Sequence, residues 1–324
     1  MYIEELYEKG KEYFKNQKFG NLLNYVETGY IKSNNRRILD QYFLKQRCVD
    51  AQEADTHCSI LGIKLSTPIV MSAMTMPISA ISDGSMEQVA RGLKQIGSLM
   101  WTGTPVPDNL SDVADTGVPL AANVKPYRDR GKMYFEIEKV LECKVNWLGL
   151  EIDAGQGTKI KDKEMGFDCA PLSSREIAKV RQKSPIPLVC KGVLSKEDAV
   201  KCVDAGADLL VISNHGGHTL DYMPHPFQVM QEIREAVGNK VELMVDGGFR
   251  RGSDVLKGLA FGASLVGLGR PVLYALAADG KKGVQDLLLQ LTQELIRLMT
   301  MVGAESLSKV DHSILIKSKS TCHY

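Results

Sequence analysis

Short apolar runs recur through the middle of the chain, and each run is bounded by glycine, proline or a polar turn. The eight runs cover residues 67–72, 98–102, 119–124, 146–152, 187–191, 208–213, 241–246 and 264–268, with a mean repeat of about 28 residues. Apolar runs without polar alternation are typical of parallel strands that are covered on both faces. A repeat of this length leaves room for a strand, a helix and two connections.

Helical periodicity fills the segments between these runs. Residues 133–141 carry apolar side chains at the i, i+4, i+7 and i+8 positions of a helix. Ser195 is placed as the N-cap of a second helix, and a third is predicted over residues 252–261. The apolar positions of residues 284–302 predict a long helix that stops at Gly303, a residue type favoured just beyond a helix C-terminus.

Eight strand units that alternate with helices predict an α/β protein with a TIM (β/α)8 barrel. A doubly wound open sheet is the alternative, although such a sheet rarely needs eight strands in so regular a rhythm. Residues 1–60 are expected to form an N-terminal extension of two or three helices, interrupted at residues 25–29. Residues 61–303 are expected to form the barrel, and residues 304–324 a C-terminal tail.

Composition narrows the classes of function. The 324 residues include 40 Lys and Arg against 39 Asp and Glu, a net charge of +1, so there is no basic excess for nucleic acid or an anionic membrane. The hydrophobic share of 44% and the charged share of 24% are ordinary for a folded domain and argue against disorder. No run of eighteen apolar residues predicts a membrane span.

The cysteines and the first residues suggest a compartment. Seven cysteines are scattered without the CxxC spacing of a zinc site, which predicts reduced thiols and no metal. The first ten residues contain Glu4, Glu5 and Glu8 and have no apolar core, unlike a secretory signal. We therefore expect a cytoplasmic protein with a small-molecule substrate.

Two glycine-rich segments follow the last two predicted strands. The first runs from Asp246 to Gly252 and the second from Gly267 to Pro271, and each contains arginine. Glycine lets backbone N–H groups approach a ligand closely, and arginine matches the geometry of a phosphate. Because these loops are where a TIM barrel commonly holds a phosphate, they predict a site for a phosphate-bearing cofactor.

Two further residues at strand ends are unusual for packing. His215, between Asn214 and two glycines, follows the sixth predicted strand and is a candidate general base, because its ordinary pKa lies near neutrality. Lys191 ends the fifth predicted strand, where burial of its charge needs a partner. It could balance an anionic ligand or an electron-rich ring.

Several of these segments together resemble the FMN-dependent α-hydroxy-acid oxidase and dehydrogenase family. They are KGV at 191–193, SNHGG at 213–217, LDYMP at 220–224, DGGFRRGSDVLKGLAFGA at 246–263 and GRPV at 269–272. The resemblance extends from Tyr25 through the C-terminal helix. It implies the TIM barrel already predicted, bound FMN, and a homo-oligomer of four or more chains.

The resemblance also implies roles for individual residues. His215 would be the catalytic base, Tyr25 would reach the substrate, and Lys191 would lie beside the flavin edge that becomes negative on reduction. The implied FMN contacts are Ser72, Ala73, Met74, Thr75, Asn123, Glu151, Lys191, Ser213, Asp246, Gly248, Arg250, Gly269 and Arg270. The implied substrate contacts are Tyr25, Lys125, His215 and His218.

The substrate side departs from the family pattern. His218 and Lys125 stand where the family has an arginine and a tyrosine, and the arginine expected soon after Asp153 is absent before Arg175. Since a bidentate arginine binds a carboxylate more strongly than lysine or histidine does, the usual carboxylate clamp is missing. Lys125, Lys159, Lys161 or His218 could replace it. The short connection after the fourth strand also suggests an open site.

These observations predict an FMN-dependent oxidoreductase that oxidises a 2-hydroxy acid or a related carbinol to the keto product. The missing arginines leave open an FMN-dependent isomerase, or an oxidoreductase for a substrate without a carboxylate. A flavin-binding protein without catalytic activity is a third interpretation, which retention of Tyr25, Lys191 and His215 disfavours. The electron acceptor, oxygen or a soluble molecule, stays open.

Overall fold

The parallel sheet at the centre of the molecule has eight strands. The computed structural model describes residues 1–17, 23–158, 162–163 and 165–318. The sheet contains β4 (Ile69–Met71), β5 (Met100–Thr102), β6 (Leu120–Val124), β7 (Trp147–Glu151), β8 (Leu188–Val193), β9 (Leu209–Ile212), β10 (Glu242–Val245) and β11 (Leu265–Leu268). Each lies within two residues of a run predicted from the sequence, so the strand predictions are confirmed.

The sheet closes into a barrel. Its strands are hydrogen-bonded in the order β4-β11-β10-β9-β8-β7-β6-β5. The first and last strands of this order also meet, because the Met71 N–H donates to the Leu99 carbonyl at 3.1 Å and the Met74 N–H donates to the Trp101 carbonyl at 3.2 Å. The TIM barrel is therefore confirmed, and the alternative of an open doubly wound sheet is wrong.

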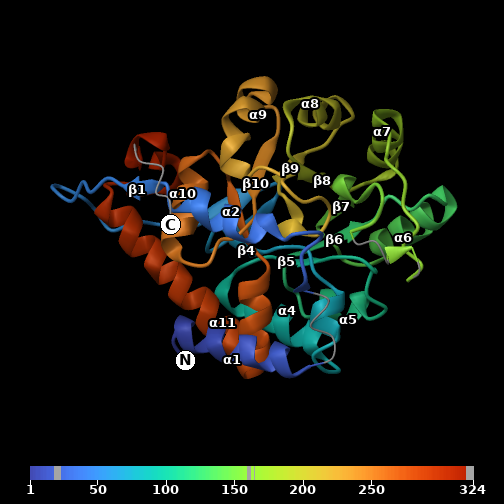
Figure 1. The fold of residues 1–324 in the computed structure, drawn as a ribbon, viewed down its shortest axis with the longest axis horizontal. Coiled ribbons are helices and arrows are strands. Elements are labelled where there is room, and N and C mark those ends of the chain that lie inside the picture. The colour runs from blue at the N-terminus through green and yellow to red at the C-terminus, as the bar shows by residue number, and fades with distance from the viewer. Residues whose placement is uncertain (18–22, 159–161, 164, 319–324) are drawn as a thin grey trace.

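Helices surround the barrel (Figure 1). They are α3 (Met76–Ser79), α4 (Ser85–Ile96), α5 (Leu110–Asp115), α6 (Arg130–Glu142), α7 (Ser174–Lys183), α8 (Lys196–Asp204), α9 (Met230–Val237), α10 (Gly252–Ala260) and α11 (Arg270–Met301). Ser195 caps α8 as predicted, since its side chain accepts a hydrogen bond from the Asp198 N–H. Gly303, with φ of +76°, follows the end of α11 as predicted.

The two ends of the chain pack on the barrel and on each other. The helices α1 (Ile3–Asn16) and α2 (Tyr30–Leu39) lie in the N-terminal extension, on either side of the predicted break at residues 25–29. Two hairpin strands, β2 (Cys58–Ile60) and β3 (Ile63–Leu65), precede the first barrel strand. The strand β1 (Tyr42–Leu44) pairs antiparallel with β12 (Leu315–Lys317). The last described residues are therefore a paired strand, a feature that the sequence pattern did not indicate.

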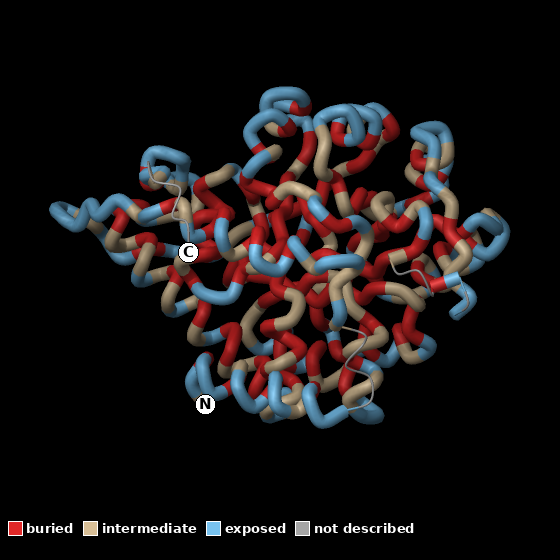
Figure 2. The backbone as a smooth tube through the Cα atoms, in the orientation of Figure 1, coloured by how far each residue is buried: buried red, intermediate tan, exposed pale blue. Residues whose placement is uncertain are grey.

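Buried residues gather along the strands and on the inner faces of the helices (Figure 2). Trp101 and Trp147 are fully buried and meet edge to face, with ring centroids 6.4 Å apart. Such a core fixes the strand ends rigidly, which suits a site built on them. In the described part of the chain, no helix is long and apolar enough to cross a membrane.

Candidate active site

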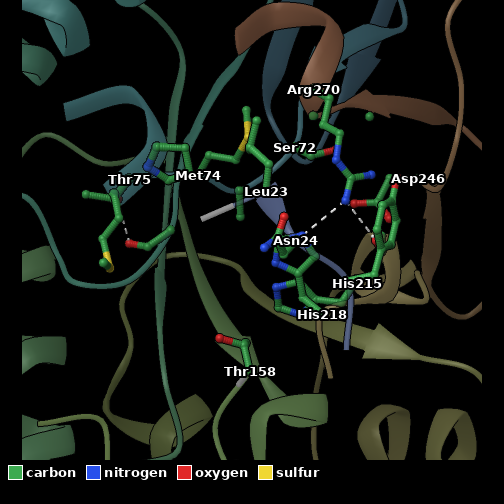
Figure 3. Close-up of a pocket in the computed structure, with 18 of the residues that line it drawn as sticks. Leu23, Asn24, Ser72, Met74, Thr75, Thr158, His215, His218, Asp246 and Arg270 are labelled. Carbon is green, nitrogen blue, oxygen red and sulfur yellow. Dashed lines mark hydrogen bonds between the residues drawn. The ribbon is translucent and has the colours of Figure 1, made fainter. Parts of the chain in front are cut away.

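A cavity of about 990 Å³ opens at the carboxyl ends of the barrel strands. It is lined by fifteen of the residues predicted from the sequence: Tyr25, Ser72, Ala73, Met74, Thr75, Lys125, Glu151, Lys191, His215, His218, Asp246, Gly248, Arg250, Gly269 and Arg270. In Figure 3, Met74 and Thr75 lie on one side of the pocket, and His215, His218 and Asp246 lie on the other. The barrel therefore brings these distant segments together.

Two predicted contacts, Asn123 and Ser213, lie behind the cavity wall. The Asn123 side chain is fully buried, accepts a hydrogen bond from Trp101 Nε1 at 2.8 Å and donates to Glu151 Oε1 at 3.3 Å. Ser213 Oγ donates to Asp246 Oδ1 and accepts from the His215 N–H at 3.0 Å. Both residues hold a lining residue in place within the protein.

The loop that carries His215 has an uncommon backbone. His215, Gly216 and Gly217 have successive φ values of +52°, +59° and +80°, a region that disfavours side chains other than glycine. A Cβ on Gly217 would lie 2.8 Å from the Tyr25 ring, so glycine permits this close approach. The Gly217 carbonyl also accepts a hydrogen bond from the Val26 N–H at 3.0 Å. The N-terminal extension thereby places Tyr25 against the histidine loop.

The His215 ring is held by a buried carboxylate. Its Nδ1 lies 2.7 Å from Asp153 Oδ2 and 3.2 Å from Lys191 Nζ. Because a carboxylate can only accept, Nδ1–H donates to Asp153 and Nε2 is left as the basic nitrogen for a ligand. Burial alone would raise the pKa of Asp153, but the charges of His215 and Lys191 hold that pKa below its ordinary value. An ionised carboxylate therefore orients the imidazole.

Lys191 is buried among carboxylates. Burial alone would lower the pKa of its ammonium, but the charges of Asp153, Glu151 and Asp246 outweigh burial and raise that pKa. Glu151 pairs with Lys191 across β7 and β8, so the two side chains stand at the same level of the barrel. Lys191 therefore stays charged beneath the cavity, with its charge balanced by the protein.

Several features of the cavity fit a flavin mononucleotide. Gly247 and Gly248 follow β10 with φ of +119° and +85°, and a Cβ on Gly267 would collide with Ser72 Oγ, so backbone faces the cavity closely. Ser72 Oγ and Glu151 Oε2 are buried lining atoms that find no hydrogen-bond partner among the described residues. A polar ring edge could satisfy such atoms, and Arg250 and Arg270 suit a phosphate.

Arg270 links this end of the cavity to the histidine loop. Its guanidinium donates to the Gly216 carbonyl at 3.0 Å, lies 3.1 Å from His218 Nε2, and stacks over the Tyr25 ring at 4.5 Å from the centroid. Figure 3 shows Arg270 pointing toward this loop. His218, predicted as a substrate contact, is thus engaged with Arg270.

A second buried ion pair lies at the mouth of the barrel. Lys125 Nζ donates to Asp162 Oδ2 at 2.7 Å and to Thr158 Oγ1 at 3.1 Å. The same Asp162 oxygen accepts from Thr158 N at 2.6 Å and Thr158 Oγ1 at 2.7 Å. Lys125 and Asp162 are both about 5% exposed and, with Thr158, line the cavity. The structure thus gives Lys125 a carboxylate partner within the chain.

The sequence pattern did not indicate the contacts of Asp153, Thr158 and Asp162. Asp153 directly follows Glu151 and Ile152 at the end of a strand, a position that could have marked it as a site residue. Thr158 and Asp162 lie in an irregular connection, where no pattern indicated their contacts. Lys159 and Lys161, two of the candidates for the missing arginines, lie outside the described residues.

Comparison with known proteins gives a consistent result. A family model described as FMN-dependent dehydrogenase matches residues 11–174 and 158–317. The chain is 27% identical to L-lactate oxidase from Lentilactobacillus hilgardii, over 97% of this chain and 94% of the relative. It is 30% identical to 2-hydroxyacid oxidase 1 from Mus musculus, over 82% of each chain.

Solved structures share the fold. A mandelate oxidase variant solved with (S)-mandelic acid superposes with a TM-score of 0.90, at 28% identity and over 99% of this chain and 100% of the other. Another variant, in which an arginine is replaced by leucine, was solved with 2-hydroxy-phenylacetamide and gives a TM-score of 0.89 at 29% identity. It covers 98% of this chain and 99% of its own.

Proposed function

The chain belongs to the FMN-dependent dehydrogenase family and is an FMN-dependent oxidoreductase, and from this premise we propose that it oxidises a 2-hydroxy acid to the 2-keto acid. The relatives described above are oxidases of lactate, of 2-hydroxy acids and of mandelate. The comparisons do not favour an isomerase, and no specific observation supports a protein that only stores flavin.

One observation carries the proposal: the 2.7 Å contact between His215 Nδ1 and Asp153 Oδ2, with the ring in the wall of the cavity. This contact turns Nδ1 toward Asp153, so Nε2 is the ring nitrogen that faces a ligand and would accept the proton that the substrate CH–OH group loses. Asp153 then stabilises the positive charge that forms on the imidazole. Held in this way, a histidine acts as a general base near neutral pH.

We propose that FMN binds in this cavity and is held by those of its predicted contact residues that line the cavity wall. When bound, FMN supplies the acceptor for the two electrons that leave the substrate. Lys191 provides a fixed positive charge, which would stabilise the negative charge that the flavin ring gains on reduction. Arg250 and Arg270 would bind the phosphate, and the backbone at Gly248 and Gly269 allows it to come close.

On the substrate side, we propose Tyr25, Lys125, His215 and His218 as the contacts. Tyr25 reaches the cavity through its approach to Gly217, and Lys125 offers an ammonium at the end of β6. Neither lysine nor histidine has the bidentate geometry of arginine. We therefore expect the carboxylate to be held less tightly than by an arginine clamp.

The test is anaerobic mixing of the FMN-loaded protein with a panel of 2-hydroxy acids, with flavin absorbance followed by stopped flow. At least one acid should bleach the flavin, and His215→Asn should slow bleaching by about 10³-fold, the size of a lost general base. FMN content and melting temperature, measured on both proteins, control for folding. Bleaching by His215→Asn at the wild-type rate would contradict the proposed role.

We also propose a cytoplasmic homo-oligomer of four or more chains. The six described cysteines are free, which suits a reducing compartment. The oligomer rests on resemblance to the family. Light scattering during size-exclusion chromatography would test it, and a mass equal to one chain would contradict it.

A further inference from the structure

The mouth of the cavity contains a lysine whose charge is cancelled within the chain. Lys125 Nζ and Asp162 Oδ2 are 2.7 Å apart, and both side chains are almost completely buried. Burial alone would raise the pKa of Asp162, but the hydrogen bonds from Lys125 and Thr158 lower that pKa below its ordinary value. Asp162 is therefore an anion at neutral pH.

The geometry leaves part of the lysine available to a ligand. An ammonium has three N–H donors, and within the described part of the chain Asp162 and Thr158 accept two of them. The Lys125 ammonium also lies 4.8 Å from the centroid of the Phe167 ring, and both residues line the cavity. As far as the described residues go, Lys125 keeps one donor for a ligand in the cavity, and it offers this donor as half of a neutral pair.

Position in the barrel adds to this electrostatic picture. Val124 pairs with Leu150, and Glu151 pairs with Lys191, so Lys125 follows at the level of Glu151 and Lys191. Lys191 is itself surrounded by carboxylates. A substrate carboxylate near these strand ends therefore meets two lysines that already face acidic side chains.

We propose that Asp162 determines specificity: by neutralising Lys125, it makes the site select only weakly between a 2-hydroxy acid and the neutral amide of the same acid. This inference rests on the proposed function, because it concerns the ligand of the same site. The 2-hydroxy acid remains the substrate class, and Asp162 determines how strongly the site prefers the charged acid over the neutral amide. Lys125 serves mainly as a hydrogen-bond donor, which an amide carbonyl satisfies nearly as well as a carboxylate.

The test uses ligands that bind without reacting. Neither 2-hydroxy-2-methylpropanoate nor its primary amide has a hydrogen on the hydroxyl-bearing carbon, so neither can be oxidised. Dissociation constants for both are measured on the FMN-loaded protein by calorimetry and by perturbation of the flavin spectrum. The wild-type ratio of acid to amide affinity should lie within about threefold of unity, because the Lys125–Asp162 pair carries no net charge.

Three variants separate charge from structure. Asp162→Asn removes the anion and should raise the affinity ratio at least about tenfold in favour of the acid, as expected for one uncompensated charge at close range. Asp162→Glu keeps the charge and should leave the ratio near the wild-type value. Lys125→Gln leaves Asp162 unpaired and should shift the ratio at least about tenfold toward the amide, which keeps the proposal testable if Asp162→Asn does not fold.

Asp168→Asn is the matched control. Asp168 lies in the same connection, but it is half-exposed and pairs with Arg128 at 3.2 Å, so its loss should leave the ratio unchanged. Equal ratios in wild type and Asp162→Asn would overturn the proposal, as would the same shift in Asp162→Asn and Asp162→Glu. Because these ligands do not react, weak binding selectivity and failure to oxidise hydroxy acids are measured separately.

Discussion

The two sides of the cavity are built differently. On the β8–β11 side, which holds Lys191, His215, Asp246 and Arg270, the residues stand at the ends of strands or in short loops directly after them. On the β6–β7 side, which holds Lys125, Glu151 and Asp162, an irregular connection contributes half of the Lys125 ion pair. These four residues of the first side match the family pattern, although His218 after β9 does not, whereas Lys125 on the second side departs from that pattern.

The two sides of the cavity differ in how freely their sequence can change. The residues that we propose for the chemistry are mostly fixed by a closed sheet and a fully buried core, so small displacements are costly. The residues that we propose for substrate selection lie partly on a connection, which can change sequence without disturbing the barrel. We therefore expect substitutions on the β8–β11 side to affect rate, and substitutions on the β6–β7 side to affect selectivity or local stability, except at Asp153, which contacts His215.

The largest expected effect is from Asp153→Asn. The hydrogen bond between Asp153 and His215 joins the two sides of the cavity, because Asp153 follows β7 and His215 follows β9. An amide cannot stabilise the imidazole cation as a carboxylate does, so flavin reduction by substrate should slow by about 10³-fold. Stopped-flow reduction at saturating substrate measures this. Asp204→Asn, at the exposed end of α8, is the control and should leave the rate unchanged. An unchanged rate in Asp153→Asn would contradict the role of Asp153.

A smaller effect is expected from Gly217→Ala, which would disturb the contact of Tyr25 and Ile31 with the histidine loop. The added Cβ would lie 2.8 Å from the Tyr25 ring and 3.1 Å from Ile31, so catalytic efficiency should fall between about tenfold and 100-fold. Gly262→Ala is the matched control, because Gly262 has φ of +92° but a Cβ added there would meet no heavy atom within 4 Å.

Both alanine variants should lose about 1 kcal/mol of unfolding free energy through backbone strain at positive φ. Only Gly217→Ala should also lose catalytic efficiency. If the two variants lose activity equally, contact between the histidine loop and Tyr25 does not matter for catalysis.

The smallest effect concerns stability on the β6–β7 side. Glu176 accepts hydrogen bonds from the Ser173 backbone and hydroxyl and from Arg130, which lower its pKa from 4.5 to about 2. Arg130 in turn binds the Pro171 carbonyl at 2.7 Å, at the end of the connection that contains Asp162. Glu176 and Arg130 therefore anchor that connection.

Because the pKa of Glu176 is lowered on folding, its contribution to stability is complete above about pH 4.5 and is lost as the pH falls to about 2. The wild type should exceed Glu176→Gln in unfolding free energy by less than about 1 kcal/mol at neutral pH. Denaturant titrations at decreasing pH should show this difference shrinking. A difference that grows as the pH falls would contradict the assignment.

The sequence was sufficient for the barrel and for much of the β8–β11 side because their signals are local. An apolar run indicates a strand, and the histidine between Asn214 and Gly216 can be recognised as a candidate base without knowledge of the fold. Contacts between distant segments carry no such signal. Asp153 is 62 positions from His215, and Asp162 is 37 positions from Lys125, so each pair forms only when the closed barrel brings the ends of different strands together. The pairing of β1 with β12 could not be predicted either, because these strands lie near opposite ends of the chain.

We propose that this cavity couples a base at His215 to oxidation of a 2-hydroxy acid. The most direct measurement is a single anaerobic turnover of the FMN-loaded protein, in which bleached flavin and released 2-keto acid are both quantified. We expect one keto acid for each flavin reduced, and a strongly slowed turnover in His215→Asn. Absence of bleaching with every 2-hydroxy acid tried, or bleaching without keto acid, would contradict it.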